Sequence, residues 1–218
     1  HSIYDGASFD NNIVCCDEKE IVSVDAITDA FKRQLSACGA MEISERQADM
    51  LAREVLLDYP GPDCRPNPKW VGRDAAELAR VGGFQVPESC RLLFVDVGRD
   101  IDNVFARIEQ MMPIMPFVRA RDIDHAIAMA KQYEHGFRHT AIIHSRDVHN
   151  MTTMGRELDT TLYVKNGACM ASLGLGGEGY LSFSIATPTG EGVTTPLTFT
   201  RERRCSMIES LCILGKPQ

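Results

Sequence analysis

Short apolar runs alternate with amphipathic segments along most of the chain. Strand-like apolar runs occur at residues 20–24, 91–97, 114–120, 140–144 and 161–165. Segments with apolar residues three or four positions apart, typical of helices, occur at residues 26–38, 44–58, 74–81, 123–133 and 148–158. Strands that are apolar throughout are buried on both faces. The pattern therefore predicts an α/β fold, with a three-layer, largely parallel sheet covered by helices on both faces. Ligands of such sheets are expected at the carboxyl ends of the strands.

Several helix boundaries carry their own signals. Ser44 and Gln47 have the spacing of a capping box, and Asp122 precedes a helix as a cap. Gly39 is expected to end the helix at 26–38, whose apolar residues should share one face: Ile27, Ala30, Phe31 and Leu35.

Two other segments give different predictions. Residues 59–69 contain four prolines, which remove backbone donors, so we expect a long surface loop there. The apolar stretch at residues 205–214 predicts a terminal strand that could pair with the sheet edge of a neighbouring subunit. This strand makes a homo-oligomer the expected assembly.

Composition narrows the classes of partner. With 218 residues and a formal charge of −7, the chain can build one ordinary domain, and we treat residues 1–218 as that domain. Apart from Arg201, Arg203 and Arg204 it has no basic cluster, which argues against nucleic acid. It has neither a long apolar run nor a secretory signal, so we expect no membrane span and a cytoplasmic location. Because it begins with His1 rather than Met, we expect a piece of a longer protein.

The cysteines indicate a reactive role more than a structural role in disulfides or a zinc site. No C-x-x-C pair is present among the eight, which disfavours zinc and predicts reduced thiols and no metal site. Cys15 and Cys16 stand side by side in the polar segment SFDNNIVCCDEKE, between Asn12 and Asp17. We expect this loop to be exposed to solvent, and one of its two cysteines to be a candidate nucleophile.

Other candidate groups give weaker signals. The glycines of GLGGEG at 174, 176 and 179 have the spacing of a dinucleotide fingerprint, but no strand precedes them and no helix follows. His135, His139 and His144 are not spaced for joint metal binding, although one of them could line a cleft. Met111, Met112 and Met115 are expected to fill a core or a cleft. Glu109 lies beside this apolar run, where its carboxylate needs a partner.

Taken together, a series of motifs resembles one enzyme family over nearly the whole chain. In order, these are SFDNN with Cys15 and EKE, WVGRDA, RLLFV, EQMMPIMP, RHTAIIHS, YVKNG, GLGGEG, ATPTGEG and FTRERRC. They are similar to those of the CoA-acylating aldehyde dehydrogenases of bacterial microcompartments, of the ethanolamine and propanediol types. The resemblance covers the C-terminal catalytic half of that family and leaves out its NAD-binding domain.

The resemblance implies an activity and roles for individual residues. The family converts a short aliphatic aldehyde, NAD and coenzyme A to acyl-CoA and NADH, which implies Cys15 as the nucleophile that carries the acyl group and Cys16 as a bystander. It implies that Glu109 holds the nicotinamide ribose. For Asn166, Gly176 and Gly177 it implies positions near the cofactor cleft.

The resemblance also implies an oxyanion hole shared between domains. The Cys15 N–H would supply one half, and an Asn of the missing domain the other. It further implies residence in the microcompartment lumen, with shell contacts through the missing region. The chain departs from the family's usual residues at Val14, Cys16 and Ala168, which leaves the size of the aldehyde open.

The nearby acids Asp10, Asp17 and Glu18 should disfavour the Cys15 thiolate unless Lys19 compensates. We therefore expect a slow thiol and no NAD-dependent turnover from the fragment alone. Two alternatives stay open: a cofactor-free cysteine acyltransferase or thioesterase with His139 as base, and a non-catalytic assembly fragment.

Overall fold

A computed structural model describes residues 1–186, 192–206 and 208 of the chain. Eight strands are present in these residues: β1 (Ile21–Val24), β2 (Met41–Glu42), β3 (Leu56–Leu57), β4 (Arg65–Pro66), β5 (Leu93–Asp96), β6 (Ile114–Ala120), β7 (Thr140–Ile143) and β8 (Leu162–Lys165). The helices are α1 (Ser2–Ala7), α2 (Asp25–Ala37), α3 (Glu45–Val55), α4 (Ala75–Val81), α5 (Val104–Arg107), α6 (Ile123–Tyr133) and α7 (Val148–Leu158). Three short 3₁₀ helices are η1 (Phe9–Asn12), η2 (Cys169–Leu173) and η3 (Pro196–Phe199).

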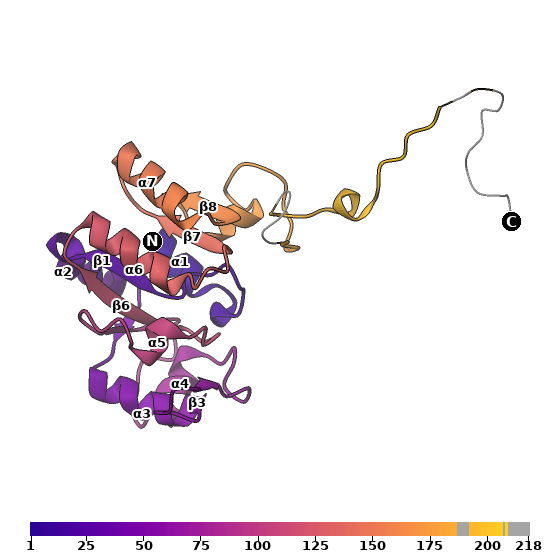
Figure 1. Ribbon diagram of the computed structural model, residues 1–218. Coiled ribbons are helices and arrows are strands. Elements are labelled where there is room, and N and C mark those ends of the chain that lie inside the picture. The colour runs from indigo at the N-terminus through magenta and orange to yellow at the C-terminus, as the bar shows by residue number, and fades with distance from the viewer. Residues whose placement is uncertain (187–191, 207, 209–218) are drawn as a thin grey trace, which may run out of the picture.

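A parallel four-stranded sheet forms the centre of the molecule, in the order β1-β6-β5-β2 (Figure 1). Ile21 of β1 lies opposite Phe117 of β6, and Leu93 of β5 lies opposite Ile114 of β6. Strands β7 and β8 form a separate parallel pair, and β3 and β4 an antiparallel pair. The predicted parallel sheet is therefore confirmed. In the described residues, however, the predicted strands belong to two separate parallel sheets, β1-β6-β5-β2 and β7-β8.

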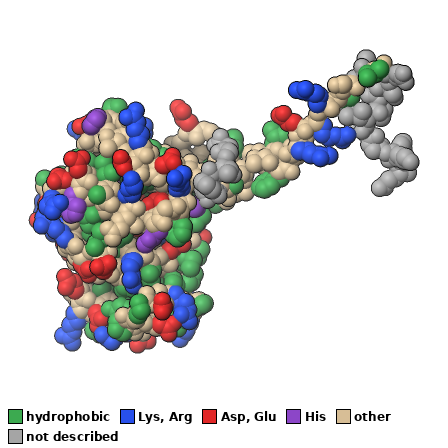
Figure 2. All heavy atoms as spheres, in the orientation of Figure 1, with side chains coloured by type: hydrophobic (Ala, Val, Ile, Leu, Met, Phe, Trp, Pro, Cys, Tyr) green, Lys and Arg blue, Asp and Glu red, His purple; other side chains and the backbone are tan. Residues whose placement is uncertain are grey.

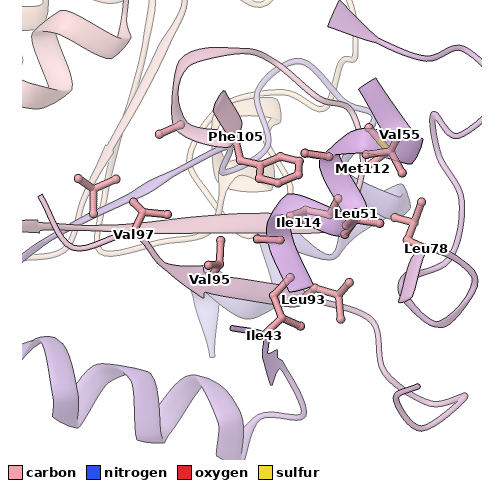
Figure 3. Packing of buried hydrophobic residues seen from close by; sticks show 14 of the residues in the cluster. Ile43, Leu51, Val55, Leu78, Leu93, Val95, Val97, Phe105, Met112 and Ile114 are labelled. Atoms are coloured by element: carbon pink, nitrogen blue, oxygen red, sulfur yellow. The ribbon is translucent and has the colours of Figure 1, made fainter. Parts of the chain in front are cut away.

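Helices cover both faces of the central sheet, as predicted. On one face, residues of α3, α4, α5 and α6 belong to one buried cluster with Leu93, Val95 and Ile114. Figure 3 shows part of this cluster, with residues of α3, α4 and α5 beside the strands. On the other face α1 and α2 pack against Phe94, Met115 and Phe117. Successive residues of β5 and β6 thus point to opposite cores, as the two-residue period of a strand requires. Met112 and Met115 are fully buried, in agreement with a core role.

The predicted end signals act as expected at several helices. Ser44 and Gln47 form a reciprocal capping box at α3. The Asp122 carboxylate accepts the His125 N–H at the start of α6. Gly39 follows α2 with a φ of 108°, a conformation that favours glycine.

Three local predictions were wrong. On α2, Ile27 and Ala30 are exposed, and the buried side is formed by Thr28, Phe31 and Leu35. Helix α3 ends at Val55 rather than near residue 58, because the next two residues form β3. The proline-rich segment is not wholly irregular, since its β4 pairs with β3; proline is tolerated on such an edge strand. The sequence analysis did not predict α1, β2 or α5, which are too short to show a periodic pattern.

The segment after β8 is largely irregular. Beyond η2 a single bridge pairs Ile185 with Val193, and past Thr195 the described chain leads away from the folded body (Figure 1). Leu197 and Phe199 are more than 70% exposed there. Figure 2 shows hydrophobic side chains on this part of the chain, beyond the folded body. Most of the predicted terminal strand at residues 205–214 lies outside the described residues. None of the described helices is long and apolar enough to cross a membrane.

Candidate active site

A tight turn presents Cys15 to solvent. The Asp17 N–H donates to the Val14 carbonyl over 3.0 Å, and the Val14 N–H donates back to the Asp17 carboxylate over 3.1 Å. Cys15 and Cys16 are the two central residues of this turn. Cys15 is exposed, whereas Cys16 is 1% exposed. The two adjacent thiols therefore have different environments, and only Cys15 is accessible to a substrate.

Asn12 fixes both ends of the cysteine loop. Its buried side-chain amide donates to the carbonyls of Ala7 and Glu18, over 2.9 and 2.8 Å. The Lys19 ammonium donates to the Asn12 backbone and side-chain oxygens, over 2.7 and 3.1 Å. A buried amide with all these partners holds a single geometry, because any other orientation would leave polar groups unpaired.

The segment leading into the loop is bent by three consecutive left-handed residues. Asp10, Asn11 and Asn12 have φ values of 43°, 52° and 64°. Asn and Asp tolerate this region better than other side chains do. The Asn11 amide also donates to the Gly72 carbonyl and to Asp74, which anchors the bend to the start of α4.

The structure brings Glu109 to the cysteine loop. Its carboxylate lies 3.5 Å from the Lys19 ammonium and is half exposed. The partner that the sequence analysis required is therefore Lys19, at an exposed position. Cys15 precedes β1 and Glu109 precedes β6, so both lie at the amino ends of neighbouring parallel strands. These two candidate residues therefore lie at the opposite end of the strands from the end at which ligands are expected.

The surroundings of Cys15 disfavour its thiolate. Partial burial raises the pKa of the Cys15 thiol, and the charges of Cys16 and Glu109 add to this, whereas Lys19 opposes it. The direction agrees with the predicted slow thiol, but the cause differs. Burial has the largest effect, followed by Cys16 and then Glu109, rather than the three acids nearest in sequence.

Beneath the turn lies a buried polar cluster. Asp17 is 5% and Glu18 8% exposed, so the prediction of a solvent-exposed loop was wrong on this side. The Cys169 N–H of η2 donates to Glu18 over 3.1 Å, and its thiol donates to Asp17 over 3.2 Å. Burial raises the pKa of Asp17 to about 6 and that of Glu18 to about 7. The fold thus brings a distant segment into direct contact with the nucleophile turn.

The described hydrogen bonds of Asn166 and the surroundings of Gly176 and Gly177 do not include Cys15. Asn166 has a φ of 57°, and its side-chain oxygen accepts the Ser145 N–H over 2.9 Å, next to the carboxyl ends of β7 and β8. Gly176 is exposed in open space, and a Cβ at Gly177 would lie 2.6 Å from the Ala171 carbonyl. The segment follows η2 and leads into irregular chain. This supports rejection of a dinucleotide fingerprint, which would need a strand before it and a helix after it.

The three histidines make their described contacts with residues other than Cys15. His139 contacts Thr140 and Glu134, and the His135 ring contacts the Arg107 carbonyl. His144 lies beyond the end of β7, and burial lowers its pKa. The described contacts include none between a histidine and Cys15.

Three residues that organise the site were not predicted, namely Gly6, Asn12 and Cys169, and Lys19 was predicted only as a charge near Cys15. A Cβ at Gly6 would lie 2.0 Å from a Glu18 carboxylate oxygen, so the glycine makes room for that side chain. The asparagine and lysine flank Cys15 in SFDNNIVCCDEKE, so proximity in the sequence could have indicated them. No local signal identifies Cys169, which is 152 positions from Asp17.

The chain is similar to curated enzymes and solved structures. It is 55% identical over 217 residues to the acetylating acetaldehyde dehydrogenase of Bilophila wadsworthia, covering 98% of this chain and 45% of the relative. The propionaldehyde dehydrogenase of Rhodopseudomonas palustris, solved with bound CoA and an acylated cysteine, is 42% identical with a TM-score of 0.87; the match covers 94% of this chain and 46% of that one.

A third match comes from a fucose-utilisation microcompartment of Clostridium phytofermentans. This propionaldehyde dehydrogenase is 38% identical, with a TM-score of 0.87, over 97% of this chain and 47% of that one. No protein-family model matches the chain. The chain spans about half the length of the relatives that it matches.

Proposed function

Because this chain is a homologue of the CoA-acylating aldehyde dehydrogenases along almost its whole length, we propose that its full-length protein oxidises a short aliphatic aldehyde to acyl-CoA. NAD accepts the hydride in this reaction, and coenzyme A takes the acyl group. The 55% identity to the acetylating enzyme of B. wadsworthia and the acylated cysteine in the R. palustris structure support this assignment. The substrate class comprises acetaldehyde, propionaldehyde and aldehydes of similar size.

Cys15 is the proposed nucleophile. Its thiolate adds to the aldehyde carbonyl carbon, and loss of hydride from that carbon leaves a thioester on the Cys15 sulfur. The thiol of coenzyme A loses its proton to water and attacks this thioester, so that the acyl group moves to CoA and the Cys15 thiolate is released. The exposed position of Cys15 at the tip of a fixed turn is the observation that carries the proposal.

The backbone of the turn has a further proposed role. The Cys15 N–H makes no hydrogen bond to another residue in the described part of the chain. It is therefore available to donate to the oxygen that becomes negative as the thiolate adds. The fixed Val14–Asp17 turn keeps this N–H and the adjacent sulfur in a constant relative position, which lowers the reorganisation needed during reaction.

The residues present fit an NAD ribose on one side of the site. Glu109 offers a half-exposed carboxylate next to the loop, and carboxylates accept hydrogen bonds from ribose hydroxyls. We assign it the nicotinamide ribose, and assign Asn166, Gly176 and Gly177 to the rim of the cofactor cleft. Residues 1–218 then form the catalytic domain with its oligomerisation segment, and most NAD contacts belong to a domain outside this chain.

Assembly and location follow as further parts of the proposal. We assign the protein to the cytoplasm and, within it, to a microcompartment lumen, because the C. phytofermentans relative comes from such a compartment. A homo-oligomer and a shell contact outside this chain complete the assignment. His139 has no described contact with Cys15, which disfavours the cysteine–histidine thioesterase alternative.

Two cysteine variants of the full-length protein test the function. Cys15→Ala should abolish formation of NADH and acyl-CoA from aldehyde, NAD and CoA. Cys16→Ala is the matched control and should retain turnover, because its sulfur is buried. Absence of activity with every short aldehyde in the unaltered protein would refute the proposal.

A further inference from the structure

Three potential metal ligands meet under the nucleophile turn. The Sγ atoms of Cys16 and Cys169 and a carboxylate oxygen of Asp17 lie within 4.8 Å of one another, and all three residues are buried. They come from two segments that the fold brings together, the turn before β1 and η2. A thiol pair beside a carboxylate is a donor set suited to a thiophilic divalent cation.

One sulfur–oxygen distance in this group is close to that expected around a coordinated ion. A tetrahedral ion with sulfur at about 2.3 Å and oxygen at about 2.0 Å holds the two ligand atoms roughly 3.5 Å apart. The Cys169 Sγ and Asp17 Oδ1 are 3.2 Å apart. A shift of a few tenths of an ångström would therefore admit the ion between them.

The neighbouring Glu18 carboxylate, which lies against Gly6, is also short of hydrogen-bond donors. Glu18 contacts the Cys169 backbone and thiol, and its Oε2 is buried without a hydrogen-bond partner among the described residues. No described ion pair reaches either Asp17 or Glu18, although Glu18 is more than nine-tenths buried. Buried carboxylates normally require a cation or several donors, and this pair has neither in full.

We propose that Cys16, Asp17 and Cys169 form a binding site for a thiophilic divalent cation such as zinc, with water as the fourth ligand. Each thiol releases its proton to water as the thiolate binds the ion. Two thiolates and one carboxylate supply three negative charges, one fewer than a four-cysteine zinc site. The site does not use Cys15 and stands apart from the proposed dehydrogenase function.

Such an ion would fix the base of the nucleophile turn. Asp17 Oδ2 already accepts the Val14 N–H that closes the turn. With Oδ1 on the ion, one carboxylate would link η2, the ion and the Cys15 turn. The ion is therefore structural in this proposal, because its ligands are buried and none of them is the exposed Cys15 thiol.

Cobalt(II) alone, added to the reduced full-length protein, is the test. We expect thiolate-to-cobalt charge-transfer absorption and the visible bands of a tetrahedral ion, saturating at one ion per chain and lost when Zn²⁺ displaces Co²⁺. Cys16→Ala and Cys169→Ala should abolish the charge-transfer band. Asp17→Asn should weaken Co²⁺ binding at least about tenfold, since even outer-shell changes have effects of that order.

Controls separate this site from other thiols and from unfolding. Cys15→Ala and Cys90→Ala should keep the band, because neither thiol belongs to the site. In the unaltered protein the cobalt band should persist after the exposed thiols are blocked with iodoacetamide, because Cys16 and Cys169 are buried and Cys15 is exposed; this measurement needs no variant to fold. The absence of thiolate-to-cobalt absorption, its persistence in Cys16→Ala, or its loss when only the exposed thiols are blocked would each overturn the proposal.

Discussion

Replacement of Gly6 by alanine should loosen the support of the nucleophile turn. A Cβ at this position would lie 2.0 Å from Glu18 Oε2 and 2.5 Å from Oε1. Real contacts of this kind are rarely below 3.0 Å, so the carboxylate must withdraw by at least about 1 Å, as overpacked side chains do. The 3.1 Å hydrogen bond from the Cys169 N–H to Glu18 would then break.

The expected cost can be estimated from these contacts. A buried N–H left without its partner costs about 1–3 kcal/mol, and overpacking adds about 1–3 kcal/mol. Alanine regains about 0.5–1 kcal/mol relative to glycine within a helix. We therefore expect Gly6→Ala to lower the free energy of unfolding by about 1–5 kcal/mol.

A double-mutant cycle identifies the cause of this loss. Urea unfolding followed by circular dichroism would compare Gly6→Ala in the unaltered protein and in a Glu18→Ala background. The substitution should be costly only while the Glu18 carboxylate is present, with a coupling energy of at least about 1 kcal/mol. Gly98→Ala, whose added Cβ meets no atom within 4 Å, should cost the same in both backgrounds. An equal cost of Gly6→Ala with and without Glu18 would refute the reasoning.

Three further predictions concern the same loop. Because burial raises the pKa of Glu18 from 4.5 to about 7, the folded protein binds this proton more tightly, and stability should fall as pH rises through that window. Glu18→Gln should flatten the dependence by up to about 1.4 kcal/mol per pH unit in urea unfolding at several pH values, whereas the exposed Glu54→Gln should not. Glu109→Gln should lower the pKa of the Cys15 thiol, seen as a shift of the iodoacetamide rate profile to lower pH; an unchanged profile would contradict the assigned charge effect. Asn12→Ala leaves two buried carbonyls without their donor and should cost about 2–4 kcal/mol and slow acyl transfer, and normal stability in thermal unfolding would count against its role.

Regular elements with strong periodicity were predictable from the sequence. Strand β6 and helices α6 and α7 have the predicted bounds, because each has a clear apolar period and, for both helices, an aspartate cap. The exposed face of α2 was not predictable in this way. Its Thr28 is buried and hydrogen-bonded to Ser23, while Ile27 is more than half exposed, so tertiary packing overrides the apolar pattern.

The site was predictable where its residues are neighbours in the sequence or belong to recognised motifs. Cys15 and Glu109 came from motifs, and the structure adds Lys19 as the residue that links their segments. The buried cluster beneath the turn was not predictable. In the sequence, Asp17 looks like an exposed acidic residue of a loop, and Cys169 has no other cysteine near it. The spacing argument against metal ligation considers only nearby cysteines and does not test a pair that the fold assembles from distant segments.

Direct detection of the acylated residue is the most decisive measurement. The full-length protein would be incubated with propionaldehyde and NAD without CoA, then digested and examined by mass spectrometry. We predict a propionyl thioester on the Cys15 sulfur and none on Cys16, removed when CoA is added. An acyl group on another residue, or turnover without any acyl group on Cys15, would contradict the account.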